Sequence, residues 1–516
     1  MFFSEIFSNL AYGLSVAFTT TNIFFLLVGA LVGMVVGLFP GFGPAAGIAI
    51  LIPMTFGMDP TTAIITLAGI YYGSMYGGTI TSILINTPGE SATVASTLDG
   101  YPMAQNGRAG PALVMQAIAS FFGGTLGVVL ICAFAPILAQ FATQFGPSEY
   151  FLIIMLGMLL LTTMMGDNLL NGIISALFGF VISVIGVDSV SGAQRYTFGS
   201  PELIGGIDFV PVAIGLFGIG ELLHCIYIGQ HKKANERLQF SFRSKDFWPT
   251  AKDYLESKWT FLRGSVIGFI AGVLPGSGAT IGSILAYSVE KTVAKDPEKF
   301  GKGEMRGLVA PETANNAASA GAMVPLISLG IPGSGATAVL LGALMMWGLQ
   351  PGPTLIDSNP DLVWGLVASM YLGNMILIVL NIAAIPVFVK ILDVPYRLIV
   401  PVIAILCVIG AYAMHNSIIE AAMILIMGLI GFGMKVYGYS PAATVLALVL
   451  GGMAESKFLQ SLIISQGSLS IFVERPISLV LTLVMIMSVV ISMGLKAYKR
   501  AKAKKAASAH CEPAVK

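Results

Sequence analysis

Two polar stretches interrupt long apolar segments of this sequence, and their residue types suit the binding of small ions. Residues 82–96 read SILINTPGESATVAS, and residues 324–343 read VPLISLGIPGSGATAVLLGA. Breaking a helix within lipid leaves backbone amides and carbonyls without partners, which proteins accept where those groups face a cavity or a bound ion. The amides at a half-helix N-terminus suit an anion, whereas free carbonyls and hydroxyls suit a cation.

One glycine-rich interruption also precedes each polar stretch. Residues 39–47 (FPGFGPAAG) match residues 274–282 (LPGSGATIG) at an offset of 235. Residues 87–93 (TPGESAT) match residues 331–337 (IPGSGAT) at an offset of 244. Each copy then runs to a Gly-Pro-x-Leu motif, so the landmarks keep their order. The chain is therefore interpreted as a duplicated module, roughly 20–140 and 260–385, followed in each half by further spans.

The interruptions supply the candidate binding residues, and none of them is expected to be catalytic. We expect a substrate shell formed by Gly41, Gly43, Asn86, Thr87, Pro88, Gly89, Ser91, Gly276, Ser277, Gly278, Pro332, Gly333, Ser334, Gly335 and Thr337. The candidate cation ligands are Glu90, Asn315 and Asn316. The alternative is Gly/Ser packing between close helices. That alternative explains single glycines better than it explains paired Pro-Gly breaks in both halves.

Two carboxylates in these segments each have two interpretations. Glu90 either binds a cation or complements the dipole at the start of a half-helix. Glu312 is either a functional buried carboxylate or an N-terminal helix acid close to the cytoplasmic surface, with Arg306 six residues upstream. In the first copy, Tyr71, Tyr72, Ser74 and Tyr76 occupy the stretch that corresponds to the two asparagines.

Composition places most of the chain in a membrane. Of 516 residues, 56% are hydrophobic and 10% are charged, against about 25% charged in soluble proteins. The apolar runs are continuous rather than alternating, which excludes a β-barrel. The expected fold is an all-α polytopic membrane protein with roughly ten to twelve spans, two pseudo-symmetric repeats, and in each repeat a re-entrant hairpin and a Pro-Gly-broken helix.

The distribution of charge predicts topology and segment boundaries. Residues 231–263 hold eight Lys/Arg against four Asp/Glu, and residues 496–505 hold six Lys/Arg and no acid, so both are expected to be cytoplasmic. The expected segments are an N-terminal interfacial segment (1–21), a first half (22–230), a cytoplasmic loop (231–262), a second half (263–495) and a cytoplasmic C-terminal tail (496–516). Residues 5–18 are expected to form a short interfacial helix.

Charges flanking the second interruption predict its orientation. Residues 290–306 carry five basic and four acidic residues, so 264–289 would enter and leave on the cytoplasmic side as a re-entrant hairpin. The first copy has no basic flank and suits a hairpin entered from outside, which makes the repeats inverted. The alternative is a single kinked span with its ends on opposite sides.

Several classes of protein are excluded or disfavoured by absent motifs. The four Cys and four His fit no disulfide or metal spacing, so no metal site or cofactor is expected. The sequence lacks a GxxxxGK[ST] phosphate loop, and Met164 stands where a GxGD protease motif needs glycine. The basic tail suits topology better than nucleic-acid binding. A passive anion channel remains the alternative to a carrier, because broken helices also line pores.

Longer motifs carry a family resemblance. GLFPGFGPAAGIAILIP (37–53), the 82–96 stretch and APETANNAASAGAMVPLISLGIPGSGAT (310–337) closely resemble the large membrane subunit of the tripartite tricarboxylate transporters, the TctA type. The resemblance extends from the first span to about residue 490.

The resemblance implies a multi-pass subunit of a secondary transporter in the bacterial inner membrane. It implies symport of citrate-like tricarboxylates or related organic carboxylates, coupled to a cation gradient, commonly Na⁺ with H⁺ as the alternative, by an elevator-like mechanism. It also implies two protein partners, a small membrane subunit (TctB type) and a periplasmic solute-binding protein (TctC type).

Overall fold

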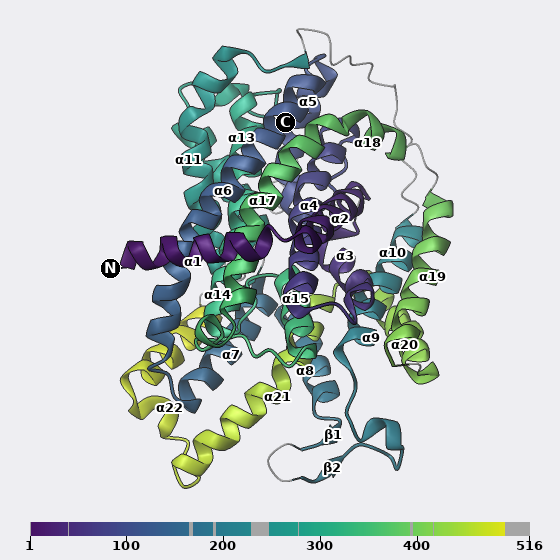
Figure 1. Ribbon diagram of the computed structural model, residues 1–516, viewed down its shortest axis with the longest axis vertical. Coiled ribbons are helices and arrows are strands. Elements are labelled where there is room, and N and C mark those ends of the chain that lie inside the picture. Colours follow the sequence, from purple (N-terminus) through teal and green to yellow (C-terminus); the bar gives the residue numbers. More distant parts are fainter. Residues whose placement is uncertain are drawn as a thin grey trace, which may run out of the picture.

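The computed structural model describes residues 2–39, 41–164, 169–188, 192–228, 247–276, 278–392, 396–415 and 417–490. Over these residues the protein is a bundle of helices with one small pair of strands (Figure 1). Residues 231–246 of the expected cytoplasmic loop and the expected tail 496–516 lie outside the described part of the chain.

The elements fall on either side of the undescribed stretch 229–246. Before it come α1 (Phe2–Ala17), α2 (Thr20–Leu38), α3 (Gly43–Leu51), η1 (Ile52–Thr55), α4 (Pro60–Ile85), η2 (Ser91–Thr93), α5 (Val94–Gln105), α6 (Ala109–Ala142), α7 (Pro147–Met164), α8 (Leu169–Ser183), β1 (Gly186–Val187), β2 (Gln194–Arg195), η3 (Pro201–Leu203), α9 (Phe209–Ala213), η4 (Ile214–Ile219) and α10 (Gly220–Ile228). After it come α11 (Ala251–Val273), α12 (Gly278–Val293), η6 (Pro297–Lys299), α13 (Met305–Gly321), α14 (Met323–Leu329), α15 (Gly335–Met346), α16 (Leu355–Ser358), α17 (Pro360–Ala383), α18 (Ile385–Leu392), α19 (Tyr396–His415), α20 (Ile418–Val436), α21 (Pro441–Ile464) and α22 (Ile471–Glu474).

Among the described residues, six helical segments are long and apolar enough to cross a membrane, so the chain is a multi-pass membrane protein. They are Thr20–Leu38, Ala109–Ala142, Phe209–Ile228, Pro360–Ala383, Ile418–Val436 and Pro441–Ile464. Shorter apolar helices accompany them, for example α3 and α15. The expected total of ten to twelve spans stays a prediction, because the shorter helices do not cross a bilayer by length alone.

Local sequence explains where several helices begin. Asp59 accepts the amide of Thr61 at 3.0 Å, and Pro60 follows as the first residue of α4. Ser440 accepts the amide of Ala443 at 3.2 Å at the start of α21. The expected N-terminal helix is present as α1, which packs against α17. The β1–β2 pair is the one departure from an all-α fold within the described residues.

Two helix pairs pack through rows of glycine in the same way. A Cβ added at a glycine of α2 would lie within about 2.4 Å of a backbone carbonyl oxygen of α4, and one added on α11 within 2.9 Å of a carbonyl of α13. The α2–α4 contacts are Gly29–Thr66, Gly33–Ile70 and Gly37–Ser74, and the α11–α13 contacts are Gly264–Ala310, Gly268–Ala314 and Gly272–Ala318. The two sets are related by the offsets of 235 and 244 that relate the sequence motifs.

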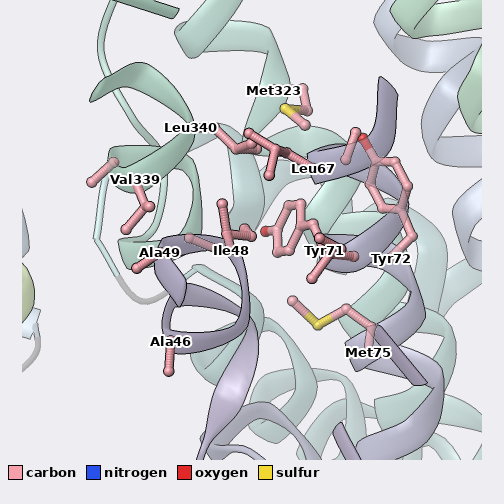
Figure 2. Close-up of a cluster of buried hydrophobic side chains, with 14 of the residues drawn as sticks. Ala46, Ile48, Ala49, Leu67, Tyr71, Tyr72, Met75, Met323, Val339 and Leu340 are labelled. Atoms are coloured by element: carbon pink, nitrogen blue, oxygen red, sulfur yellow. The ribbon is translucent and has the colours of Figure 1, made fainter. Parts of the chain in front are cut away.

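The buried core joins the two parts of the chain. Figure 2 shows Tyr71 of α4 within a cluster to which α3 contributes Ile48 and Ala49 and α15 contributes Val339 and Leu340. All five side chains are 0% exposed. The helix after the first glycine interruption, α3, therefore packs against α15, the helix after the Pro-Gly sequence of the second polar stretch.

Candidate functional site

The first break (residues 86–91) ends α4 and leaves a short non-helical stretch before α5. Asn86 adopts the left-handed conformation, with φ of 51°, directly after the last residue of α4. Gly89 then donates its amide to the carbonyl of Gly78 at 3.1 Å. The hydroxyl of Thr93 donates to the carbonyl of Glu90 at 3.0 Å and accepts the Glu90 amide at 3.5 Å. Glu90 thus lies at the N-cap of η2, as the half-helix interpretation expects.

The second break (residues 330–335) repeats this local geometry between α14 and α15. Gly330 adopts the left-handed conformation, with φ of 71°, after the last residue of α14. The hydroxyl of Thr337 donates to the carbonyl of Ser334 at 3.0 Å and accepts the Ser334 amide at 2.8 Å. Helices are therefore interrupted at both expected places, because a left-handed residue, Asn86 or Gly330, ends each preceding helix and the proline that follows lacks an amide donor.

Each glycine turn between paired helices contacts the break of its own half. Gly41, in the α2–α3 turn, donates its amide to the carbonyl of Gly89 at 3.2 Å. Gly276, in the α11–α12 turn, donates to the carbonyl of Gly333 at 3.0 Å. A Cβ at Gly89 would lie 2.3 Å from the carbonyl oxygen of Gly37, so the close approach requires glycine.

Side chains also connect each break with helices of the other half. The amide of Asn315 on α13 donates to a carboxylate oxygen of Glu90 at 3.3 Å. The hydroxyl of Tyr71 on α4 lies 3.4 Å from the hydroxyl of Ser334. In addition, Ser91 and Thr280 share a hydroxyl–hydroxyl contact of 2.8 Å. The structure therefore brings the two turns and the two breaks into one connected region, which we call the central site.

The two candidate asparagines behave differently. The Oδ1 atom of Asn315 is buried and has no hydrogen-bond partner within the described part of the chain, so it remains available as an acceptor. Asn316 donates to the carbonyl of Glu312 in its own helix at 3.1 Å and lines a separate small cavity with Tyr72 and Asn374. Asn315 thus contacts the first break, whereas Asn316 faces another part of the core.

Exposure differs between the two halves of the central site. Gly41, Asn86 and Ser91 are exposed, whereas Gly89 of the first half and Gly276, Gly278, Pro332, Gly333, Gly335 and Thr337 of the second are buried. Ser334, Thr87, Pro88, Glu90 and Gly43 are intermediate. Ser277 lies outside the described residues. The first half of the central site is consequently more open than the second.

Glu312 is 0% exposed and lies seven residues after Met305, the first residue of α13, so it is not an exposed acid in the first turn of that helix. Its carboxylate accepts hydrogen bonds from the hydroxyls of Thr79, Ser96 and Ser120. Sequence reasoning did not select these three hydroxyls, because Ser and Thr are common in apolar helices and nothing in their spacing links α4, α5 and α6. The buried carboxylate itself was the available signal that hydroxyl partners must exist nearby.

Several basic side chains of the described residues form ion pairs away from the central site. Arg108 lies 2.8 Å from Asp253, Arg263 lies 2.8 Å from Glu290, and no Lys or Arg in the described part of the chain forms an ion pair with Glu90 or Glu312. Outside the six candidate spans, burial opposes ionisation of Asp253, but hydrogen bonds from Arg108 and Thr250 outweigh it and lower its pKa. The described residues contain no cluster of three His, Cys, Asp or Glu side chains that could hold a metal ion.

Comparison with known families decides the class of the protein. Residues 23–446 match the model of the tripartite tricarboxylate transporter TctA family. The chain belongs to this family. The TctA-family protein is therefore the large membrane subunit of a tripartite tricarboxylate transporter and not an enzyme.

Two relatives from Agrobacterium vitis have names that state no function. The TctA-family protein is 40% identical over 489 residues to an uncharacterized 52.8 kDa protein in the TAR-I ttuC′ 3′ region, covering 95% of this chain and 96% of the relative. It is 41% identical over 211 residues to an uncharacterized protein in the TAR-II ttuC′ 3′ region, covering 41% of this chain and 87% of the relative. The first of these similarities spans nearly the whole length of both proteins.

Proposed function

We propose that this TctA-family protein is the permease of a secondary transporter that imports citrate-like tricarboxylates or related organic anions, driven by a cation gradient, with Na⁺ as the first candidate. It works with a TctB-type small membrane subunit and a TctC-type periplasmic binding protein in the bacterial inner membrane. The observation that carries the proposal is the contact of each glycine turn with the break of its own half, together with the contacts of each break with a helix of the other half, in one central site.

The central site has the chemistry to hold a carboxylate. Ser334 is the N-cap of α15, and the backbone amides and the positive end of the helix dipole there favour an anion. The hydroxyls of Ser91, Thr87 and Ser334 are exposed or partly exposed at the breaks and can donate to carboxylate oxygens. Glu90 would repel the substrate, so a cation beside Glu90 would favour binding of substrate and cation together.

The cross-contacts support the interpretation of two pseudo-symmetric repeats. Positions 71 and 315 are equivalent under the offset of 244, and so are positions 90 and 334. Tyr71 contacts Ser334 while Asn315 contacts Glu90, so equivalent residues exchange partners between the halves. Such reciprocal contacts are typical of a two-fold relation.

The arrangement of α11 and α12 supports the proposal of a re-entrant hairpin. Arg263 on α11 and Glu290 on α12 form an ion pair, with the Gly276 turn at the other end of the two helices. The end of α12 therefore lies beside the middle of α11, so the two helices run antiparallel on either side of the turn, as a re-entrant hairpin requires. The unequal exposure of the two halves of the central site supports alternating access, with one side open at a time.

Transport into proteoliposomes tests the proposal directly. The vesicles would contain this protein and its small subunit, and uptake of radiolabelled di- and tricarboxylates would be measured with and without the binding protein under a Na⁺ or H⁺ gradient. We expect uptake that requires both the gradient and the binding protein. Rapid flux that needs neither would contradict the proposal and would indicate a passive anion channel.

A further inference from the structure

We propose that Glu312, together with the hydroxyls of Thr79, Ser96 and Ser120, forms a binding site for one monovalent cation, either Na⁺ or H⁺. The role of this cation as the coupling ion rests on the proposed function, whereas its binding does not. The three hydroxyls and the carboxylate are defined as the Glu312 cage.

The cage draws one side chain from each of four helices. The Thr79 hydroxyl of α4 donates to Oε2 of Glu312 at 2.7 Å, and the Ser120 hydroxyl of α6 approaches the same oxygen at 3.4 Å. The Ser96 hydroxyl of α5 donates to Oε1. Glu312 itself lies within α13. The helices α4 and α5 flank the first break, and α6 follows α5. The fourth helix, α13, belongs to the other half of the chain.

Burial and the absence of a basic partner among the described residues favour a positive ion or a proton in the cage. All four side chains are 0% exposed. No Lys or Arg of the described residues pairs with Glu312, and the carboxylate of Glu90 is close enough to act on it electrostatically. Moving an unpaired carboxylate from water into such surroundings costs several kcal/mol, about as much as a folded domain can lose without unfolding. A bound cation or a proton removes that cost.

The composition of the cage favours a monovalent ion. It offers a single negative charge and neutral oxygen ligands, so one positive charge neutralises it and a divalent ion would leave an excess. Hydroxyl groups can donate to the carboxylate when the cage is empty and turn their lone pairs toward a hard cation when it is filled. A protonated carboxyl group can donate to one of the same hydroxyls, so both ions share this chemistry.

The position of the cage connects the ion to the central site. Asn315, which contacts Glu90 at the first break, lies three residues after Glu312 and therefore on a neighbouring position of the same helix turn. Neutralising Glu312 fixes α13 against α4, α5 and α6. Binding of the cation thereby favours one placement of the two halves relative to each other.

Cation-dependent thermal stability of the purified full-length protein, without any carboxylate, tests the cage. Unfolding temperatures would be measured from low to high NaCl with choline chloride holding ionic strength constant, and separately from pH 8 to pH 6 without Na⁺. We expect the wild-type protein to gain about 2–5 °C in one of these two series. The series that responds identifies the ion. The gain should be absent in Glu312→Gln and reduced in Thr79→Val.

A second buried carboxylate provides the matched control. Glu149 is also 0% exposed and accepts a hydroxyl, from Ser478 at 2.6 Å, but it pairs with Arg475 at 2.8 Å. Glu149→Gln should keep the full cation response. If Glu312→Gln does not fold, Ser120→Ala and Thr79→Val, which keep the carboxylate, should each weaken the apparent cation affinity about tenfold, equivalent to one lost hydrogen bond.

The outcomes separate this proposal from the proposed function. A response to neither ion, or a response that persists unchanged in Glu312→Gln or in both hydroxyl variants, overturns the Glu312 cage as a cation site. A response that depends on Glu312 in a protein that takes up no carboxylate supports the cage and contradicts the proposed function.

Discussion

The amide of Asn315 donates to the carboxylate of Glu90 at 3.3 Å, and this contact joins α13 to the first break from 225 residues away. Asn315 is 0% exposed and its Oδ1 atom has no partner among the described residues. One side chain therefore holds the break with its donor and keeps an acceptor available. A side-chain amide with a free acceptor oxygen is well suited to a site that takes up a cation or a substrate hydroxyl.

Replacing Asn315 should impair transport more than folding. In Asn315→Leu, Glu90 loses a hydrogen bond to a charged group, which is typically worth about 1.5–3 kcal/mol, so the cation concentration for half-maximal uptake should rise tenfold or more. Gradient-driven uptake in proteoliposomes measures this change. Asn359→Leu, at a half-buried amide whose side chain donates to its neighbour Ser358, serves as the control and should keep the wild-type value. Equal uptake by both variants would show that Asn315 has no part in binding.

The glycines at the two breaks should not tolerate a methyl group. In Gly89→Ala the new Cβ would lie 2.3 Å from the Gly37 carbonyl oxygen, and in Gly333→Ala it would lie 2.8 Å from that of Gly272. We expect at least a hundredfold loss of uptake in Gly89→Ala and a smaller loss in Gly333→Ala, because the second approach is less close. Gly433→Ala, where a Cβ meets open space, should leave uptake unchanged.

Folding must be measured beside uptake for these glycine variants. Monodisperse elution in detergent, with the wild-type unfolding temperature, would assign a loss of uptake to the altered break. Full uptake by Gly89→Ala would mean that the first break can move away from α2 without consequence, against the close packing described above.

Asp99 should be important for stability rather than transport. It is 0% exposed and accepts the amides of Gly301, Gly303 and Glu304 at 2.8–3.0 Å, which fixes the loop before α13 to α5. Asp99→Ala leaves three backbone amides without their acceptor and should cost about 3 kcal/mol or more. Thermal unfolding should show a clear fall in Asp99→Ala and little change in Asp357→Ala, an exposed aspartate. Similar unfolding temperatures for both variants would contradict this role.

The Arg108–Asp253 pair predicts a pH dependence of stability. The pKa of Asp253 is lowered from its ordinary value of 3.8, so the ionised carboxylate stabilises the folded protein above that pH. This stabilisation is lost as the pH falls through the lower folded-state pKa. Wild-type protein should therefore unfold at a higher temperature than Asp253→Asn at pH 7, and the difference should shrink toward pH 3. A constant difference would mean that the charge of Asp253 is unimportant.

Much of the central site could be predicted from sequence because it depends on local chemistry. A Pro-Gly sequence such as Pro88-Gly89 or Pro332-Gly333 interrupts a helix within an apolar run. The matched motifs around the two sequences indicated that the two breaks are equivalent parts of one site. The hydroxyls around Glu312 could not be predicted in this way. Thr79, Ser96 and Ser120 are separated by many residues on different helices, and only packing brings them to one carboxylate.

The sequence by itself determined the membrane class, the family and the positions of the breaks, because hydropathy, proline and glycine act through neighbouring residues. Only the tertiary structure decided which of two adjacent asparagines meets the first break. Successive residues on a helix point about 100° apart, since a turn takes 3.6 residues. The rotation of α13, set by the glycine contacts with α11, turns Asn315 toward Glu90 and Asn316 toward Tyr72 and Asn374.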